Sequence, residues 1–193
     1  MFPNKIILAS QSPRRKQLLE WAEINFDIIV SATDENIPEN TPVEEVPIII
    51  AREKAMAVKA KTALNETLKP LPILAADTVV VLGNEIIVKP TDRDDAIKIL
   101  SKLSGQKHRV ITGVVLLHQE KEIAFADITE VEFHELSLEQ ITFYIDHYKP
   151  YDKAGAYAIQ EWIGVVGIKK INGDFYNVMG LPISRVVKAI YDL

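Results

Sequence analysis

The chain has 193 residues, of which 48% are hydrophobic and 25% are charged, and its formal net charge is −5. It is long enough to bury a core, as one domain or as two small lobes, without disulfides or structural metals. The absence of cysteine excludes thiol catalysis and thiolate metal sites, and it fits a reducing compartment. The acidic balance argues against broad binding of nucleic acid, which usually needs a basic excess. Because the chain shows neither a signal-peptide core nor an apolar run of membrane-spanning length, we expect a cytoplasmic protein.

The first half of the chain alternates between strand-like and helix-like segments. Apolar runs predict strands, and Ser12 with Pro13 predicts the start of a helix after the first of them. A turn at Gly83-Asn84 predicts a hairpin. In chain order we expect a strand over 6–10, a helix from Ser12, a strand over 26–30, a helix over 43–64, strands over 73–82 and 85–88, and a helix from Thr91 through Leu103.

The second half adds two predicted hairpins. Strands over 110–117 and 123–133 are expected to pair through a turn at 119–121, and segments 168–171 and 175–178 through Asn172-Gly173. Helices are expected to begin at Ser137 and Pro182. Because hairpins interrupt the helix–strand alternation, the sequence predicts an α/β fold with a mixed sheet.

Two arginines, Arg14 and Arg15, stand at the predicted N-terminus of the first helix. Guanidinium groups beside unpaired helix N–H donors either form an anion or phosphate site or remain solvated, as helix-terminal arginines often are. Lys54 lies on the apolar stripe of a later helix, where it either extends outward to solvent or points its ammonium into a pocket.

Asp77 and Thr78 interrupt a strongly apolar strand. A carboxylate there is costly to bury, so Asp77 is either a structural residue held by backbone donors or part of a functional site. Lys89 follows the paired strand and is a candidate neighbour. Segment 152–160 combines a charged pair, a glycine and small residues, which indicates a close backbone approach or a surface turn before a strand.

Together these candidates supply several cations and few carboxylates, and none of the motifs contains histidine. That pattern disfavours a serine–histidine triad and a histidine-rich zinc site. Cations with a carboxylate and a hard metal suit phosphoryl chemistry, while the lack of a Walker loop argues against a P-loop enzyme.

In this order along the chain, seven motifs resemble the Maf family of nucleoside triphosphate pyrophosphatases. They are Leu8 to Arg15, Ala51 to Ala55, Ala75 to Val80, Lys89-Pro90, Leu103 to Gly105, Asp152 to Gly155, and Gly180 to Pro182. The resemblance covers the chain as a single Maf-like domain, residues 1–193. It implies a mixed-sheet α/β fold in two lobes with a deep cleft, similar to the inosine-triphosphate pyrophosphatase fold. It also implies metal-dependent hydrolysis of a nucleoside triphosphate to the monophosphate and pyrophosphate.

The resemblance also implies roles for single residues. Asp77 matches the proton acceptor and, with Glu35, the positions that hold a divalent metal, expected to be Mg²⁺ with Mn²⁺ or Co²⁺ as alternatives. The family's basic phosphate-facing positions fall on Arg15, Lys54 and Lys89. Its substrate-discriminating positions fall on Arg14, Thr78 and Gln160.

The substrate-discriminating residues resemble the branch of the family that acts on dTTP and UTP, with modified pyrimidine nucleotides as further candidate substrates. The chain departs from its relatives at Val88 and at Ala158, where a glycine is usual, and the latter change bears on the backbone of Gln160. The resemblance implies a homodimer as well. The acidic charge and the lack of a membrane-spanning run predict no nucleic-acid polymer or membrane partner. The alternative to a pyrophosphatase is a nucleotide-binding regulator of cell division and septum formation that needs no catalysis.

Overall fold

The computed structural model describes residues 5–33 and 37–193. The elements in chain order are β1 (Ile6–Leu8), α1 (Pro13–Trp21), β2 (Phe26–Ile28), α2 (Val46–Thr62), β3 (Ile73–Leu82), β4 (Glu85–Ile87), α3 (Arg93–Leu103), β5 (Lys107–His118), β6 (Lys121–Phe133), α4 (Leu138–Tyr148), the short 3₁₀ helix η1 (Ala154–Ala156), α5 (Trp162–Gly167), β7 (Ile168–Asn172), α6 (Phe175–Met179) and α7 (Ile183–Tyr191).

In the described part of the chain, the strands form one seven-stranded sheet in the order β2-β1-β3-β5-β6-β7, with β4 paired to β3. Strand β1 runs parallel to both β2 and β3, whereas β3 with β4 and β6 with β7 are antiparallel. The predicted α/β fold with a mixed sheet is therefore confirmed. The cleft between lobes that the resemblance implies stays a prediction.

The chain divides into two compact units. Unit 1 takes the described residues of Met1–Asp77, Thr112–Asp127 and Gly180–Leu193, and unit 2 takes Thr78–Ile111 and Ile128–Met179. Strands β3, β5 and β6 contribute residues to both units. No helix among residues 5–33 and 37–193 has the length and apolar character needed to cross a membrane.

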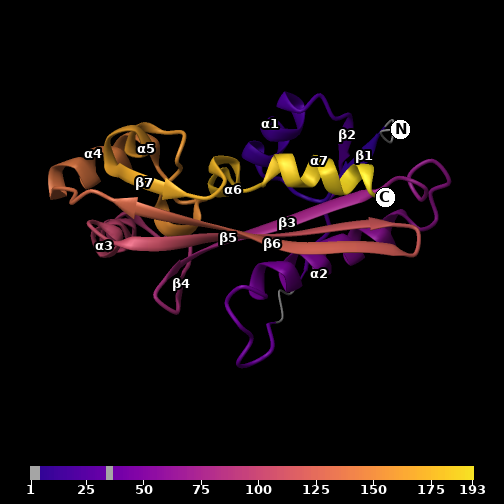
Figure 1. The fold of residues 1–193 in the computed structure, drawn as a ribbon, viewed down its shortest axis with the longest axis horizontal. Helices are drawn as coiled ribbons and strands as arrows, with labels where there is room; N and C mark the ends of the chain where they lie inside the picture. Colours follow the sequence, from indigo (N-terminus) through magenta and orange to yellow (C-terminus); the bar gives the residue numbers. More distant parts are fainter. Residues whose placement is uncertain (1–4, 34–36) are drawn as a thin grey trace. The chain divides into compact units, whose positions relative to one another are not determined.

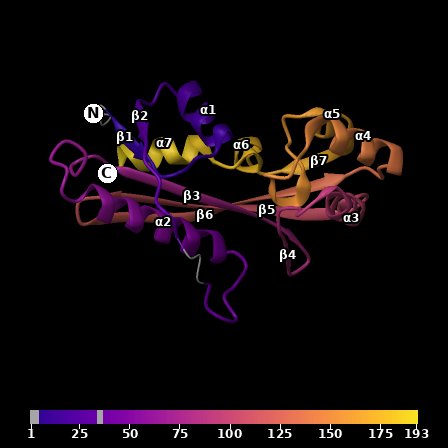
Figure 2. The same ribbon diagram turned by 180° about the vertical axis from the view of Figure 1, so that it is seen from behind.

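In unit 1, helices cover both faces of the strands. Figures 1 and 2 show α1 and α7 on one side and α2 on the other. Alternate residues of β3 and β5 meet the apolar stripe of α2 in a buried cluster, as expected for a sheet face with period two. The cluster comprises Ile7, Ala9, Ala51, Ala55, Val58, Ile73, Ala75, Val115 and Leu117.

Helix α2 lies directly on β5 at Gly113. A Cβ atom added to Gly113 would lie 2.2 Å from the carbonyl carbon of Pro47 and 2.3 Å from the backbone nitrogen of Ile48. Because these neighbours are backbone atoms, they cannot move away as a flexible side chain could. The first turn of α2 can therefore lie this close to β5 only because residue 113 has no side chain.

In unit 2, helix α3 packs against α4 and η1 over a core from α3, α4, β5 and β6. Its centre contains a polar residue, His108, whose Nε2 lies 2.7 Å from the hydroxyl of Tyr157. Phe133 contacts both rings edge-on. Burial lowers the pKa of His108 to about 4, so its imidazole is neutral in the folded protein at neutral pH.

The second predicted hairpin is wrong. Segment 175–178 belongs to helix α6, and β7 pairs instead with β6, Val131 opposite Ile171. The reason is local and then tertiary. Asp174 Oδ1 accepts from the backbone N–H groups of Tyr176 and Asn177, which caps the helix. The buried Asn177 side chain then donates to the carbonyl of Val110 and to Thr129 Oγ1.

The other predicted elements are present with small shifts at their ends. Helix α5 was not predicted. Helix α3 begins at Arg93 and not at Thr91, since Asp92 is the capping residue whose side chain accepts from the N–H of Asp95 at 2.8 Å. Segment 152–160 forms η1 and irregular backbone and does not lead into a strand.

The neutral His108 makes stability depend on pH. The pKa of His108 is about 4 in the folded protein and 6.5 ordinarily. Between these two pH values the unfolded chain binds a proton at His108 that the folded chain does not bind. We expect the free energy of unfolding to fall by about 2 kcal/mol between about pH 7 and about pH 5 from this group. Urea titrations of wild type and His108→Gln at both pH values measure it, since glutamine can bond to Tyr157 without titrating. Equal pH dependence in the two proteins would contradict the assignment.

Candidate active site

The predicted strand, turn and helix at the start of the chain are present. Ser12 caps α1 through its Oγ, which accepts from the N–H of Arg15 at 3.5 Å, and Pro13 occupies the first turn. The side chain of Arg15 turns back across this end of the helix. Its Nε donates to the carbonyl of Gly180 at 2.8 Å and its Nη1 to Ser10 Oγ at 3.1 Å. Arg15 is therefore held in one orientation by groups at the end of β1 and before α7.

Arg15 lies close enough to both Arg14 and Asp77 for their charges to act on it. Burial lowers the pKa of Arg15, the carboxylate of Asp77 opposes that shift, and the charge of Arg14 adds to it. Two neighbouring guanidinium charges in a half-buried setting favour an anionic ligand.

Lys54 and Asp77 form an ion pair, with Nζ 2.7 Å from Oδ1. Helix α2 supplies the lysine and β3 the carboxylate, and their side chains are only 23% and 18% exposed. Lys54 therefore points toward the sheet and not outward to solvent. An ammonium group, and not a set of backbone donors, meets the carboxylate that interrupts the apolar strand. Unit 1 thus brings together a carboxylate and three cations, Arg14, Arg15 and Lys54.

The remaining substrate candidates belong to unit 2. Thr78 is half-buried and directly follows Asp77 on β3. Because successive side chains of a strand alternate, the two side chains point to opposite faces. Lys89 lies two residues beyond β4 and is exposed, and Gln160 is exposed in the irregular segment before α5.

The close backbone approach predicted for segment 152–160 has a structural explanation. Gly155 has φ +71°, and a Cβ there would lie 2.9 Å from Cγ2 of Val80 in the same unit. Lys153 is 8% exposed, and its Nζ lies 2.8 Å from Asp152 Oδ1 and 3.5 Å from Glu161 Oε1. This cation serves the internal structure of unit 2.

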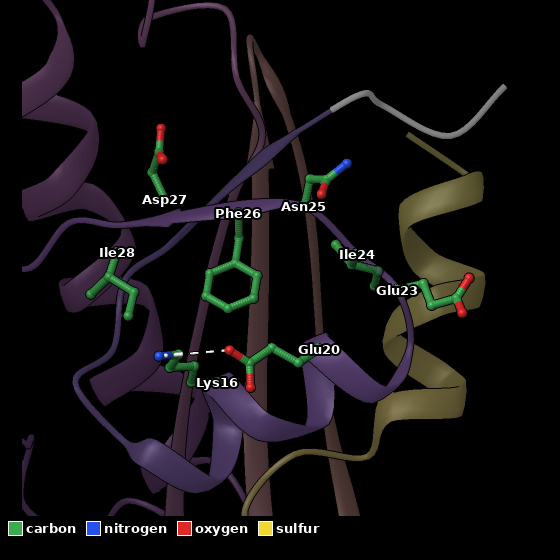
Figure 3. Close-up of a pocket in the computed structure, with 8 residues that line it drawn as sticks. All are labelled: Lys16, Glu20, Glu23, Ile24, Asn25, Phe26, Asp27 and Ile28. Atoms are coloured by element: carbon green, nitrogen blue, oxygen red, sulfur yellow. Dashed lines mark ion pairs between the residues drawn. The ribbon is translucent and has the colours of Figure 1, made fainter.

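The metal ligands are only partly described. Glu35 lies outside the described residues. Among those that are described, no group of three or more histidine, aspartate or glutamate side chains is placed to hold a metal ion. Unit 1 also carries an open hollow between α1 and β2, where Phe26 points toward the Lys16–Glu20 pair (Figure 3). None of the predicted site residues lines it.

Sequence reasoning assigned no role to Ser10 or Gly180, although both lie within the motifs quoted above. The side chain of Ser10 and the carbonyl of Gly180 hold the Arg15 guanidinium. Gly180 has φ +116°, a conformation that favours glycine. A glycine before Leu181-Pro182 was the available signal, but its partner lies 165 residues away in the chain.

Comparisons with known proteins place the chain in a family. The family described as Maf-like protein matches residues 5–193. A curated dTTP/UTP pyrophosphatase of Cytophaga hutchinsonii is 53% identical over 94% of this chain and 81% of its own length. Proteins of the same name from Phocaeicola vulgatus and Parabacteroides distasonis are 46% and 44% identical, over 94% and 96% of this chain and 92% and 94% of their own lengths. The chain belongs to the Maf-like protein family.

Proposed function

We propose that this protein is a nucleoside triphosphate pyrophosphatase that hydrolyses dTTP and UTP to the monophosphate and pyrophosphate. The observation that carries the proposal is the Lys54–Asp77 pair, 2.7 Å between Nζ and Oδ1, beside the paired arginines of α1. A carboxylate that can accept a proton, surrounded by cations that neutralise phosphate charge, is the arrangement that phosphoryl chemistry needs. The names of the relatives support this activity.

In the proposed reaction, water attacks the anhydride between the α and β phosphates, the bridging P–O bond breaks, and pyrophosphate leaves. Lys54 contacts Oδ1 of Asp77, so the second oxygen, Oδ2, is the one that we propose takes the proton from water. Arg14 and Lys54 offset the charge that develops on the phosphates, and Lys89 is proposed to join them. Arg15, held by Ser10 and Gly180, needs no reorganisation to do the same.

We further propose that the enzyme requires a divalent cation, held by Asp77 and Glu35. The half-buried carboxylate of Asp77 is a hard oxygen donor, and Mg²⁺ is typically bound through one or two carboxylates together with substrate phosphates. The donor chemistry therefore fits Mg²⁺, with Mn²⁺ or Co²⁺ as alternatives. When bound, the ion would neutralise phosphate charge and lower the pKa of a bound water.

The test of the function is the release of pyrophosphate, rather than orthophosphate, from a panel of nucleoside triphosphates with added Mg²⁺. Pyrophosphate from dTTP and UTP is the expected result. Binding of nucleotide without any pyrophosphate would instead favour the regulator of cell division.

We propose that residues 1–193 act as a single Maf-like domain in the cytoplasm. The family match across both units supports the single domain. A homodimer is proposed from the family resemblance.

Base selectivity is proposed to rest on Arg14, Thr78 and Gln160. The amide of Gln160 offers one donor and one acceptor, which suits the O4 and N3–H of uracil or thymine. We expect Gln160→Ala to lower the preference for dTTP over dATP by at least about tenfold while changing kcat for dTTP less. Specificity constants for dTTP, UTP, dATP and dGTP in wild type and variant measure it. A purine triphosphate as the best substrate of wild type would contradict the base assignment and leave the pyrophosphatase activity standing.

A further inference from the structure

The segment that carries Gln160 has no regular secondary structure. Residues 157–161 lie between η1 and α5, outside any helix or strand. Within the segment, the N–H of Glu161 donates to the carbonyl of Ala158 at 3.1 Å, which closes a turn around Gln160. A surface turn with few contacts opens locally at a low free-energy cost, so side chains from other elements that bond to it limit its movement.

Tyr144 of α4 holds both ends of this turn. Its hydroxyl accepts from the N–H of Ala158 at 3.2 Å and donates to the carboxylate of Glu161. The ring is fully buried in the core of unit 2, and the surrounding core side chains therefore fix the position of the hydroxyl at the turn. One oxygen atom thus joins the residue two before Gln160 to the residue directly after it.

Buried charge and close packing complete the support. Glu161 Oε1 lies 3.5 Å from Nζ of Lys153, a residue that is itself 8% exposed and paired with Asp152. A Cβ on Gly164 would lie 1.7 Å from the carbonyl oxygen of Ile159. The first turn of α5 therefore sits against the backbone next to Gln160 and limits its movement.

We infer that Tyr144, through Glu161 and the N–H of Ala158, is a positioning residue that sets the Gln160 amide for base discrimination. This inference rests on the proposed function, in which Gln160 reads the base. An amide that reads a base by hydrogen bonds discriminates only when its donor and acceptor are held in place. Tyr144 itself needs no contact with the nucleotide.

The variant that tests this is Tyr144→Phe, which keeps the buried ring and removes the hydroxyl. We expect the ratio of kcat/KM for dTTP over dATP to fall about tenfold, mainly through a higher KM for dTTP. Backbone amide exchange across 157–161 should become faster. Glu161→Gln should give a smaller fall and serves if Tyr144→Phe folds poorly.

Tyr148→Phe is the matched control, because it removes a hydroxyl one turn later on the same helix from a ring stacked on Tyr144. It should keep the wild-type ratio. In the Gln160→Ala background, Tyr144→Phe should lower the ratio no further, since the group it positions is gone.

The outcomes separate the two claims. If wild type prefers dTTP and Gln160→Ala loses that preference, but folded Tyr144→Phe and Glu161→Gln keep it, the positioning role is overturned and the proposed function stands. If wild type shows no preference for pyrimidine nucleotides, the base assignment fails and the positioning role fails with it.

Discussion

Asp77→Asn is expected to lower kcat for pyrophosphate release by about 100- to 10,000-fold, the range that a lost general base usually costs. Asparagine has the same shape as aspartate, and its carbonyl oxygen can still accept from Lys54 at the position of Oδ1. The fold should therefore be retained. What the amide cannot do is take a proton from water. Initial rates with saturating dTTP, together with circular dichroism, measure both parts of the expectation.

Asp27→Asn is the matched control for this experiment. Asp27 lies on β2 of the same unit and also forms a 2.7 Å ion pair with a lysine, Lys5, but its side chain is 40% exposed. The control removes the same charge and the same kind of contact away from the proposed site, so its kcat should equal that of wild type. Turnover by Asp77→Asn at the wild-type rate would show that Asp77 is not the proton acceptor.

Gly113→Ala is expected to lower the free energy of unfolding by about 3 kcal/mol or more, at or above the upper end of the cost of overpacking a core. The new methyl group would lie 2.2 Å from the backbone of Pro47, so α2 must move away from β5. Urea titration at neutral pH measures the change. Because α2 also carries Lys54, the same movement should lower kcat in the fraction that stays folded.

Gly83→Ala distinguishes close packing from backbone strain. Gly83 has φ +62°, yet nothing lies within 4 Å of a Cβ placed there. Its substitution should cost only the strain of a left-handed residue, about 1 to 2 kcal/mol. A Gly113→Ala protein no less stable than Gly83→Ala would contradict the direct contact between α2 and β5.

The parts of the fold that were predicted are those whose signals are local. Apolar runs located β1, β3 and β5, and Gly83-Asn84 located the turn between β3 and β4. The failed hairpin at 168–178 had equally good local signals. Its second half became a helix because Asp174 caps it and because Asn177 bonds in the core to Val110 and Thr129, which are distant in sequence.

In the candidate site too, the residues with local signals were predicted and the contacts between distant residues were not. The high cost of a carboxylate in an apolar strand singled out Asp77, and an alanine-flanked stripe singled out Lys54, without showing that the two are partners. Tyr144 gave no functional signal, because an aromatic residue on the apolar face of a helix is most often core. Its hydroxyl gained a role only through residues 158 and 161, which the folded chain brings to it.

The bond between Arg15 and Gly180 has a consequence for the protein while it is being made. A ribosome adding about 5 to 20 residues per second needs on the order of ten seconds or more to synthesise the chain between these two residues. Helix α1 leaves the ribosome long before the carbonyl that orients its arginine exists. Nascent chains that stop short of Gly180 therefore lack this anchor of Arg15, and the end of α1 proposed to bind phosphate is completed only as the last segment joins unit 1.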